Sequence, residues 1–332
     1  MKGQAAAVRV GILRALEEAG RPMGAAALAE RLEASGAQPR AVRYHLRRLD
    51  REGLTRFVSR RKGREISDLG REELGRAGAS RRVGMVAARI DALSFAMAFR
   101  ADEGCGTVIA NSATIHKSQL MRSMEDMKPV FSRQLGMGGR IIVAREGETL
   151  AGLTVPRDHV ALGTVCSVTL NGILLREGVP VHARFGGLVE IRDGRPVRFV
   201  ELIAYSGTSL DPMEFFIKAG LTRVRDGARS GNGILGASFR EVPSAALDRV
   251  LQGKDTLARH SLGGLLAVGR PGRPLLDIPV AEGRVGLVVA AGLNPIAAIH
   301  ETGAPIALRS LAGLEDYARF RSFQEWRDRL PR

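Results

Sequence analysis

Apolar residues recur at helical spacing near the start of the chain. Val8, Ile12 and Leu16 follow one another every four residues, and the run stops at Gly20. A period near 3.6 is typical of a helix with one buried face, and glycine ends such a helix. The pattern therefore predicts a helix over residues 5 to 19 and a second, shorter one over residues 24 to 32.

A third predicted helix has two opposed faces. It begins near Gln38-Pro39, because proline suits the first helical turn, where its missing N–H has no intrahelical partner. At 100° per residue its apolar positions lie within about 60° of one another; they are Val42, Leu46 and Leu49. The other side carries Arg40, Arg43, Tyr44, Arg47 and Arg51. One face packs and the other is cationic.

The hydrophobic period changes after Gly53. Residues 55 to 59 and 64 to 67 are predicted strands around a basic turn that ends in Gly63, where glycine accepts the positive φ of a tight turn. Three helices followed by a basic hairpin are the order of a winged helix-turn-helix, whose third helix enters the DNA major groove while the wing touches the backbone. The segment Ala41 to Leu46 resembles recognition helices of bacterial and archaeal transcription regulators.

Duplex DNA is the partner that this pattern predicts. Arginine can bond two acceptors of guanine at once, and basic residues of a wing meet phosphates. The predicted contacts to bases or phosphates are Arg40, Arg43 and Arg47, with Gln38 and Tyr44 beside them, and the predicted phosphate contacts are Arg60, Arg61, Lys62 and Arg64. The alternative is that the arginines only form a solvated face.

The remaining 250 residues contain an internal repeat. A shift of 125 positions aligns Leu162 with Leu287, and it aligns Gly178 and Pro180 with Gly303 and Pro305, without gaps. The repeat predicts two similar halves, at about 104 to 181 and 231 to 306, unless the matches arose by chance. Each half is expected to run strand, helix, strand and a further apolar segment, and a hairpin over 187 to 205 lies between them. The predicted fold class is mixed α/β, with domains at 1 to 80 and 84 to 325.

Charge supports this division. The 332 residues carry a net charge of +15, and residues 1 to 82 hold 19 Lys+Arg against 10 Asp+Glu, so a quarter of the chain carries more than half the excess. Such local positive charge favours a nucleic acid partner. No apolar stretch approaches the roughly 18 residues of a membrane span, and with only two cysteines a reducing cytoplasm is the expected location and no membrane partner is expected.

The sequence favours a protein without catalytic or metal chemistry. Its six histidines and two cysteines show no metal-ligand spacing, and no Gly-x-Ser-x-Gly nucleophile motif occurs. The segment Gly231 to Gly236 fits the glycine pattern of dinucleotide-binding folds, but a strand-like run and Pro243 follow it, where a helix would have to begin. No cofactor is expected.

Four motifs carry a family resemblance over about residues 84 to 325. They are Gly163 to Leu175, Arg184 to Ile191, Tyr205 to Pro212 and Phe239 to Pro243. In this order they resemble the regulatory domain of the nitrogen regulatory protein repressor (NrpR) family. The resemblance implies a homodimeric repressor of nitrogen-assimilation genes that binds a palindromic operator and releases it when 2-oxoglutarate binds as effector, and it adds PII-type signalling proteins as candidate partners. Complete repressors of the family often carry two such domains, whereas this chain has room for one.

Candidate effector residues follow from small polar groups inside apolar runs and from nearby cations. They are Thr164, Cys166, Ser167, Asn171, Thr208 and Ser209, with Arg184 and Arg240 as candidate carboxylate clamps. Cys166-Ser167 becomes Ala291-Gly292 in the second half, which favours a role specific to the first half. Cys166 is alternatively an inert buried thiol, and Asp211 is alternatively a helix N-cap. The alternative function is a winged-helix regulator whose C-terminal domain senses another metabolite or serves only in assembly.

Overall fold

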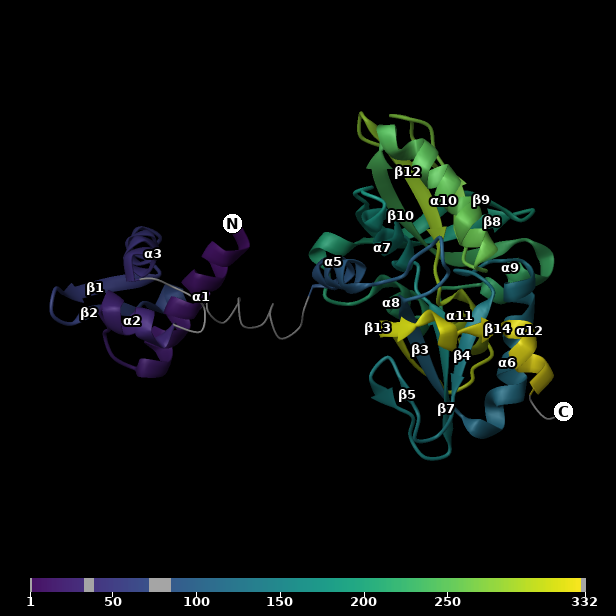
Figure 1. Ribbon diagram of the computed structural model, residues 1–332, viewed down its shortest axis with the longest axis horizontal. Coiled ribbons are helices and arrows are strands. Elements are labelled where there is room, and N and C mark those ends of the chain that lie inside the picture. Colours follow the sequence, from purple (N-terminus) through teal and green to yellow (C-terminus); the bar gives the residue numbers. More distant parts are fainter. Residues whose placement is uncertain (1, 33–38, 72–84, 330–332) are drawn as a thin grey trace. The chain divides into compact units, whose positions relative to one another are not determined.

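The computed structural model describes residues 2–32, 39–71 and 85–329, and the chain forms two compact units, Met1–Gly84 and Met85–Arg332 (Figure 1). We call them unit 1 and unit 2 and describe each by itself.

Unit 1 has the predicted winged-helix order. Its elements are α1 (Lys2–Ala19), α2 (Ala25–Arg31), α3 (Pro39–Arg51), β1 (Thr55–Ser59) and β2 (Gly63–Ile66). The strands β1 and β2 are antiparallel, and the isolated bridge between Met23 and Arg64 ties β2 to the segment before α2. Ile12, Leu28, Leu46 and other apolar residues of the three helices form one buried core.

Unit 2 is mixed α/β, as predicted. Its first part contains α5 (Val86–Ala96), β3 (Thr107–His116), η2 (Lys117–Gln119), α6 (Leu120–Ser132), β4 (Arg140–Ala144), β5 (Thr149–Leu150), β6 (Leu153–Thr154), β7 (His159–Val165) and α7 (Thr169–Arg176). The connecting part contains β8 (His182–Arg192), β9 (Arg195–Ala204), η3 (Tyr205–Gly207), α8 (Pro212–Lys218) and α9 (Val224–Ser230). The last part contains β10 (Gly233–Pro243), η4 (Ser244–Ala246), α10 (Leu247–Arg259), β11 (Leu265–Val268), β12 (Arg284–Ala290), α11 (Asn294–His300), β13 (Ala307–Asp316), η5 (Tyr317–Arg319), β14 (Arg321–Ser322) and α12 (Phe323–Arg329).

The two halves of unit 2 share one order of elements. A long strand, a 3₁₀ turn and a helix (β3, η2, α6) recur as β10, η4 and α10, and β4, β7 and α7 recur as β11, β12 and α11. The strands β3 and β10 are long, because both sides of each strand are covered and most of their side chains are buried.

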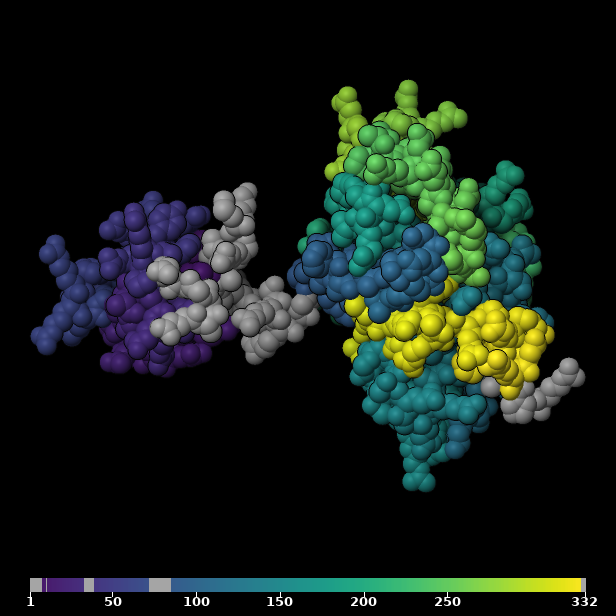
Figure 2. Space-filling model, in the orientation of Figure 1, coloured from purple at the N-terminus to yellow at the C-terminus, as the bar shows by residue number. Residues whose placement is uncertain are grey.

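The segment after each half adds two strands to the other half's sheet, β8 and β9 to the second and β13 and β14 to the first. The first sheet has the order β13-β3-β7-β4-β14, and the second has the order β11-β12-β10-β8-β9. The strand β8 follows the first half but pairs with β10 of the second, while β13 follows the second half and pairs with β3 of the first. Figure 2 shows the last segment of the chain, in yellow, lying against the teal segment of the first half. The halves are therefore interlocked.

The predicted hairpin between the halves is confirmed as β8 and β9. Its turn residues Asp193 and Gly194 both have positive φ, 49° and 75°, which matches the twist of a two-residue hairpin turn. At its other end the chain enters η3 and α8, and α8 contacts both β8 of the second sheet and β13 of the first.

Candidate DNA-binding surface and effector site

The helix α3 presents the predicted cationic face. Val42, Leu46 and Leu49 are fully buried, whereas Arg40, Arg43, Tyr44 and Arg47 are exposed on the other side. Gln38, the remaining predicted contact of this segment, lies outside the described residues.

The wing is held in a fixed shape by its turn. Lys62 donates its backbone N–H to Ser59 Oγ at 3.0 Å, and Arg60, Arg61 and Lys62 are exposed at the tip. Gly63 has φ +92°, and a Cβ there would stand 2.1 Å from the carbonyl oxygen of Met23. Only glycine fits at this position, so the tip of the wing and the segment before α2 are fixed to each other.

Arg64 differs from the other predicted phosphate contacts. Its Nε donates to Asp50 Oδ2 at 2.7 Å, Asp50 Oδ1 also accepts from the Thr55 hydroxyl at 2.6 Å, and the guanidinium lies over the Phe57 ring. Arg64 thus joins the wing to α3. The other described predicted cations have no carboxylate within 4.0 Å among the described residues; they are Arg40, Arg43, Arg47, Arg60, Arg61 and Lys62.

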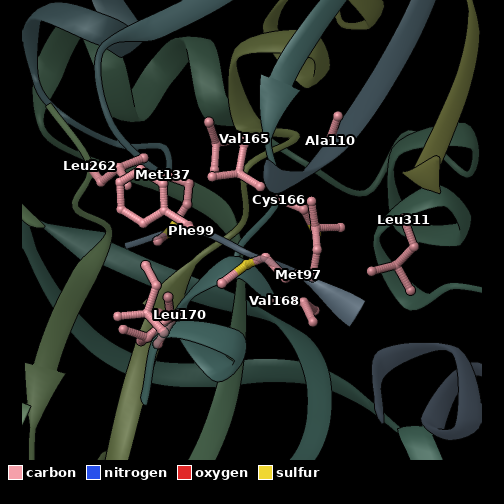
Figure 3. Packing of buried hydrophobic residues seen from close by; sticks show 14 of the residues in the cluster. Met97, Phe99, Ala110, Met137, Val165, Cys166, Val168, Leu170, Leu262 and Leu311 are labelled. Carbon is pink, nitrogen blue, oxygen red and sulfur yellow. The ribbon is translucent and has the colours of Figure 1, made fainter. Parts of the chain in front are cut away.

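In unit 2, Cys166 and Ser167 lie in the loop between β7 and α7. Both are buried, at 5% and 8% exposure, and Figure 3 shows Cys166 among apolar side chains that include Val165, Val168 and Met97. Burial raises the pKa of the Cys166 thiol to about 11, so the thiol is neutral at physiological pH.

Arg240 on β10 is a fully buried arginine. Its Nη2 donates to Ser167 Oγ at 3.2 Å, and its Nε and Nη1 have no hydrogen-bond partner among the described residues. Burial lowers the pKa of this guanidinium from its ordinary value, against the smaller opposing effects of Tyr205 and Cys166. Burying a cation with two unpaired nitrogens is energetically unfavourable, and a bound anion would offset this cost.

A small cavity of about 20 Å³ is lined by Ser167, the hydrogen-bond partner of Arg240, whereas Arg240 itself is not part of its wall. Its wall includes Cys166, Ser167, Tyr205 and Asp211. Other walls come from α5, β3, the loop before α11 and β13, through Ile90, Asn111, Gly292 and Ser310. This volume suits about one water molecule, so a five-carbon dicarboxylate does not fit in this conformation.

The structure does not bring all the predicted effector residues to this cavity. Arg184 donates to Glu241 Oε1 at 2.7 Å and lies over the Phe239 ring. Glu241 follows Arg240 directly in the regular pairing of β10, so these two side chains lie on opposite faces of the sheet. Arg184 is therefore separated from Arg240, and its charge is already paired.

The remaining predicted residues have other local roles. Thr164 Oγ1 accepts from the Asn111 amide at 3.3 Å, and the Thr208 hydroxyl donates to the Leu210 carbonyl at 2.9 Å. Ser209 is half-buried. Asn171 is buried on α7, and its Oδ1 has no hydrogen-bond partner among the described residues.

Asp211 is the helix N-cap that the sequence indicates. Its carboxylate accepts from the backbone N–H of Met213 at 2.9 Å and of Glu214 at 3.2 Å, and Pro212 opens α8. The same side chain also lies in the cavity wall. Sequence reasoning missed Tyr205 as a wall residue, although Tyr205 begins one of the four motifs.

Features of other classes of protein are not found in the described residues. The glycine pattern at Gly231 to Gly236 runs directly into β10 rather than into a helix. Over residues 2–32, 39–71 and 85–329, no group of three or more His, Cys, Asp or Glu side chains is placed to hold a metal ion. In the same ranges, no helix has the length and apolar character needed to cross a bilayer.

A winged helix with an exposed cationic face on α3, followed by a mixed α/β unit, is an arrangement typical of winged-helix transcription regulators. The model of the "NrpR regulatory domains NRD1 and 2" matches residues 83–322. The chain belongs to the NrpR family. A second model, the "Ribonuclease R winged-helix domain", matches residues 10–74 and agrees with the fold of unit 1.

Three relatives are named as global nitrogen regulators. The NrpRI protein of Methanosarcina mazei is 33% identical over 92% of this chain and 94% of its own length. The NrpR proteins of Methanococcus maripaludis and Methanocaldococcus jannaschii are 30% and 32% identical, but this chain spans 54% and 37% of their lengths. A solved nitrogen repressor-like protein from Methanococcus jannaschii superimposes with a TM-score of 0.60 at 28% identity, over 72% of this chain and 99% of that one.

Proposed function

We propose that this chain is a DNA-binding repressor of nitrogen-assimilation genes that releases its operator when 2-oxoglutarate binds unit 2. The names of its relatives support the regulatory process. The effector part rests on one observation, which is the fully buried Arg240 with unpaired Nε and Nη1.

The DNA-binding part follows from unit 1. The face of α3 with Arg40, Arg43 and Arg47 enters the major groove, and Arg60, Arg61 and Lys62 of the wing contact phosphates. These cations lack carboxylate partners among the described residues, so no internal ion pair has to break when DNA binds. A homodimer on an inverted repeat is the arrangement that gives both recognition helices equivalent half-sites.

The proposed effector site is chosen because a dicarboxylate requires a cation and hydrogen-bond donors. One carboxylate of 2-oxoglutarate pairs with the unpaired nitrogens of Arg240, and the Ser167 and Tyr205 hydroxyls supply further hydrogen bonds. Arg184 is left out of this site because Glu241 already neutralises it. Because the cavity measures only about 20 Å³, 2-oxoglutarate selects a more open conformation of its walls.

Opening the cavity displaces α5, the first element of unit 2. Ile90 of α5 lines the cavity. The backbone N–H of Val86 donates to the Thr208 carbonyl at 3.0 Å, and Arg89 donates to the Leu311 carbonyl at 2.8 Å. Both bonds join α5 to segments that line or adjoin the cavity. Since α5 follows unit 1 in the chain, its displacement is the route by which the effector lowers DNA affinity.

The test measures DNA binding by fluorescence anisotropy with the chain's own upstream region and with random duplex DNA. We expect preference for the upstream fragment, steep weakening with salt, and a further weakening of about 5- to 150-fold on adding 2-oxoglutarate, the range of typical coupling energies. By linkage, operator DNA weakens 2-oxoglutarate binding by the same factor. Equal affinity for both DNA fragments would refute the repressor assignment.

A matched variant tests the effector site separately. Cys166→Ala combined with Ser167→Gly copies Ala291-Gly292 of the second half, so unit 2 keeps its fold while 2-oxoglutarate binds more weakly. If this double variant responds as the wild type does, the effector binds elsewhere. If no metabolite raises the unfolding temperature of unit 2, the domain serves only in assembly, because a ligand that prefers the native state must stabilise it.

A further inference from the structure

Unit 2 has other, larger cavities among its described residues. One has a volume of about 380 Å³ and lies between α7 and α10, and glycine turns that precede β4 and β11 form part of its wall. No residue of its wall belongs to the wall of the cavity lined by Ser167. The volume lies in the range of small-molecule sites in proteins, about 300 to 1,000 Å³.

The duplication provides an internal comparison for this cavity. The helices α6 and α10 are both 13 residues long, and we align them by their first residues, Leu120 and Leu247, a shift of 127 that exceeds the shift in the later part of the repeat by two. At this alignment Met127 of α6 is fully buried in a hydrophobic core, but the corresponding Lys254 is exposed and lines the cavity. Phe131, whose ring stacks on Phe323 with 4.6 Å between ring centroids, corresponds to Ala258, and both Phe131 and Ala258 line the cavity. At Lys254 the second half thus has a charged side chain where the first half has a buried methionine.

Gly253 lies in the middle of α10 and lines the cavity. A glycine inside a helix costs about 1 kcal/mol relative to alanine, so it is expected only where close packing or a special backbone conformation requires it. Neither applies here, because a Cβ at Gly253 would have its nearest neighbour, Glu177 Oε2, at 3.8 Å. The absent side chain leaves space at this point of the wall, with a Glu177 carboxylate oxygen at its edge.

The wall has two chemical parts. Its floor is formed by aliphatic side chains of α7 and α10, namely Leu170, Ile173, Leu174, Val250 and Leu257. The polar part of the wall consists of Gln134, Ser261 and the exposed Lys254, whose ammonium has no carboxylate within 4.0 Å among the described residues. An apolar floor beside one unpaired cation matches a ligand with a hydrocarbon chain and a single negative group.

We propose that this cavity binds a small amphipathic monocarboxylate, with its hydrocarbon chain on the floor and its carboxylate on Lys254. The site is separate from the proposed 2-oxoglutarate site and does not depend on it. Its occupant contacts Leu170 of α7, three residues after Ser167.

The test uses the full chain and straight-chain probes in isothermal titration calorimetry. Octanoate is expected to bind more tightly than hexanoate and butanoate, by about three- to fourfold for each methylene group buried. Octanol, which lacks the charge, is expected to bind about tenfold more weakly than octanoate. Equal affinities of octanoate and octanol, or no gain with chain length, would overturn the proposal.

Four variants locate the binding. Gly253→Leu fills the cavity and is expected to abolish octanoate binding, while Lys254→Gln weakens it about tenfold. Gln252→Leu, at an exposed neighbouring position of α10, and Lys128→Gln, at an exposed position of α6, are the matched controls and keep wild-type affinity. Circular dichroism and thermal unfolding check that each variant is folded.

Two results would refute this assignment even if octanoate binds. Octanoate affinity unchanged in folded Gly253→Leu would place the probe elsewhere. If Gly253→Leu changes the oligomeric state measured by analytical ultracentrifugation but leaves octanoate affinity unchanged, the cavity is an interface with a second copy of the chain.

Discussion

Replacing Arg240 by methionine is predicted to stabilise unit 2 while it removes the effector response. In the wild type the guanidinium is fully buried, donates a single hydrogen bond of 3.2 Å to Ser167 and leaves Nε and Nη1 unpaired. An unsatisfied buried polar group costs about 1 to 3 kcal/mol. Methionine fills much of the same volume without a charge to desolvate.

The magnitude follows from these contacts. Replacing buried charged groups by apolar residues of similar volume often stabilises a protein by about 1 to 4 kcal/mol. Losing the hydrogen bond to Ser167 lowers this gain by about 1 kcal/mol. The net gain of about 0 to 3 kcal/mol corresponds to a rise of up to roughly 12 °C in the unfolding temperature of a domain this large.

The matched control is Arg184→Met, because Arg184 is an arginine of the same sheet that is paired. Its removal leaves Glu241, with a side chain 5% exposed, without its cation. We expect destabilisation of about 1 to 3 kcal/mol, reduced by the partial exposure of Arg184. The two arginine variants thus shift stability in opposite directions.

The assay is differential scanning calorimetry of the full chain, following the transition of unit 2, with and without 2-oxoglutarate. Wild-type unit 2 should gain stability with the logarithm of 2-oxoglutarate concentration, and Arg240→Met should not. An Arg240→Met protein less stable than wild type by more than 1 kcal/mol, with 2-oxoglutarate stabilisation intact, would refute the reasoning.

Three further predictions concern single residues. Arg43→Ala should cost about 1 to 3 kcal/mol of operator binding and relax the preference at one base pair, while Lys62→Ala weakens all duplexes alike, as competitive gel shifts with single-base operator variants will show. Gly63→Ala should destabilise unit 1 by more than about 1 kcal/mol, measured by urea unfolding, because its Cβ meets the Met23 carbonyl oxygen at 2.1 Å; an unchanged midpoint would contradict this. Cys166, whose pKa burial raises to about 11, should stay unreactive toward a disulfide reagent in the native protein at pH 8, so that only the half-exposed Cys105 reacts rapidly; two fast thiols would contradict the buried site.

Local sequence patterns predicted most of the elements. The opposed faces of α3 followed from helical periodicity, because Val42, Leu46 and Leu49 pack within one short unit. The N-cap at Asp211 and the turn at Asp193-Gly194 followed from backbone chemistry that involves only neighbouring residues. Such features depend on a few consecutive residues, so one sequence is enough to predict them.

Features that depend on distant residues were not predictable from the sequence. Arg184 and Arg240 look equivalent in the sequence, and only the pairing of Glu241 with Arg184 shows that one charge is neutralised and the other is not. Tyr205 and Ser310 meet Ser167 because three separate segments converge on one cavity. The role of Gly253 was likewise not predictable, because only the structure shows the cavity that it lines.

The reciprocal placement of β8 and β13 determines how unit 2 must fold. Val108 of β3 pairs with Glu315 of β13, which lies about 200 residues later in the chain. During synthesis β3 is therefore made long before its partner strand β13. Until then the edge of β3 is unprotected and open to pairing with another chain. A fragment that ends after the first half would therefore have an incomplete sheet, and we expect it to aggregate and the two halves of the intact chain to unfold in a single cooperative transition.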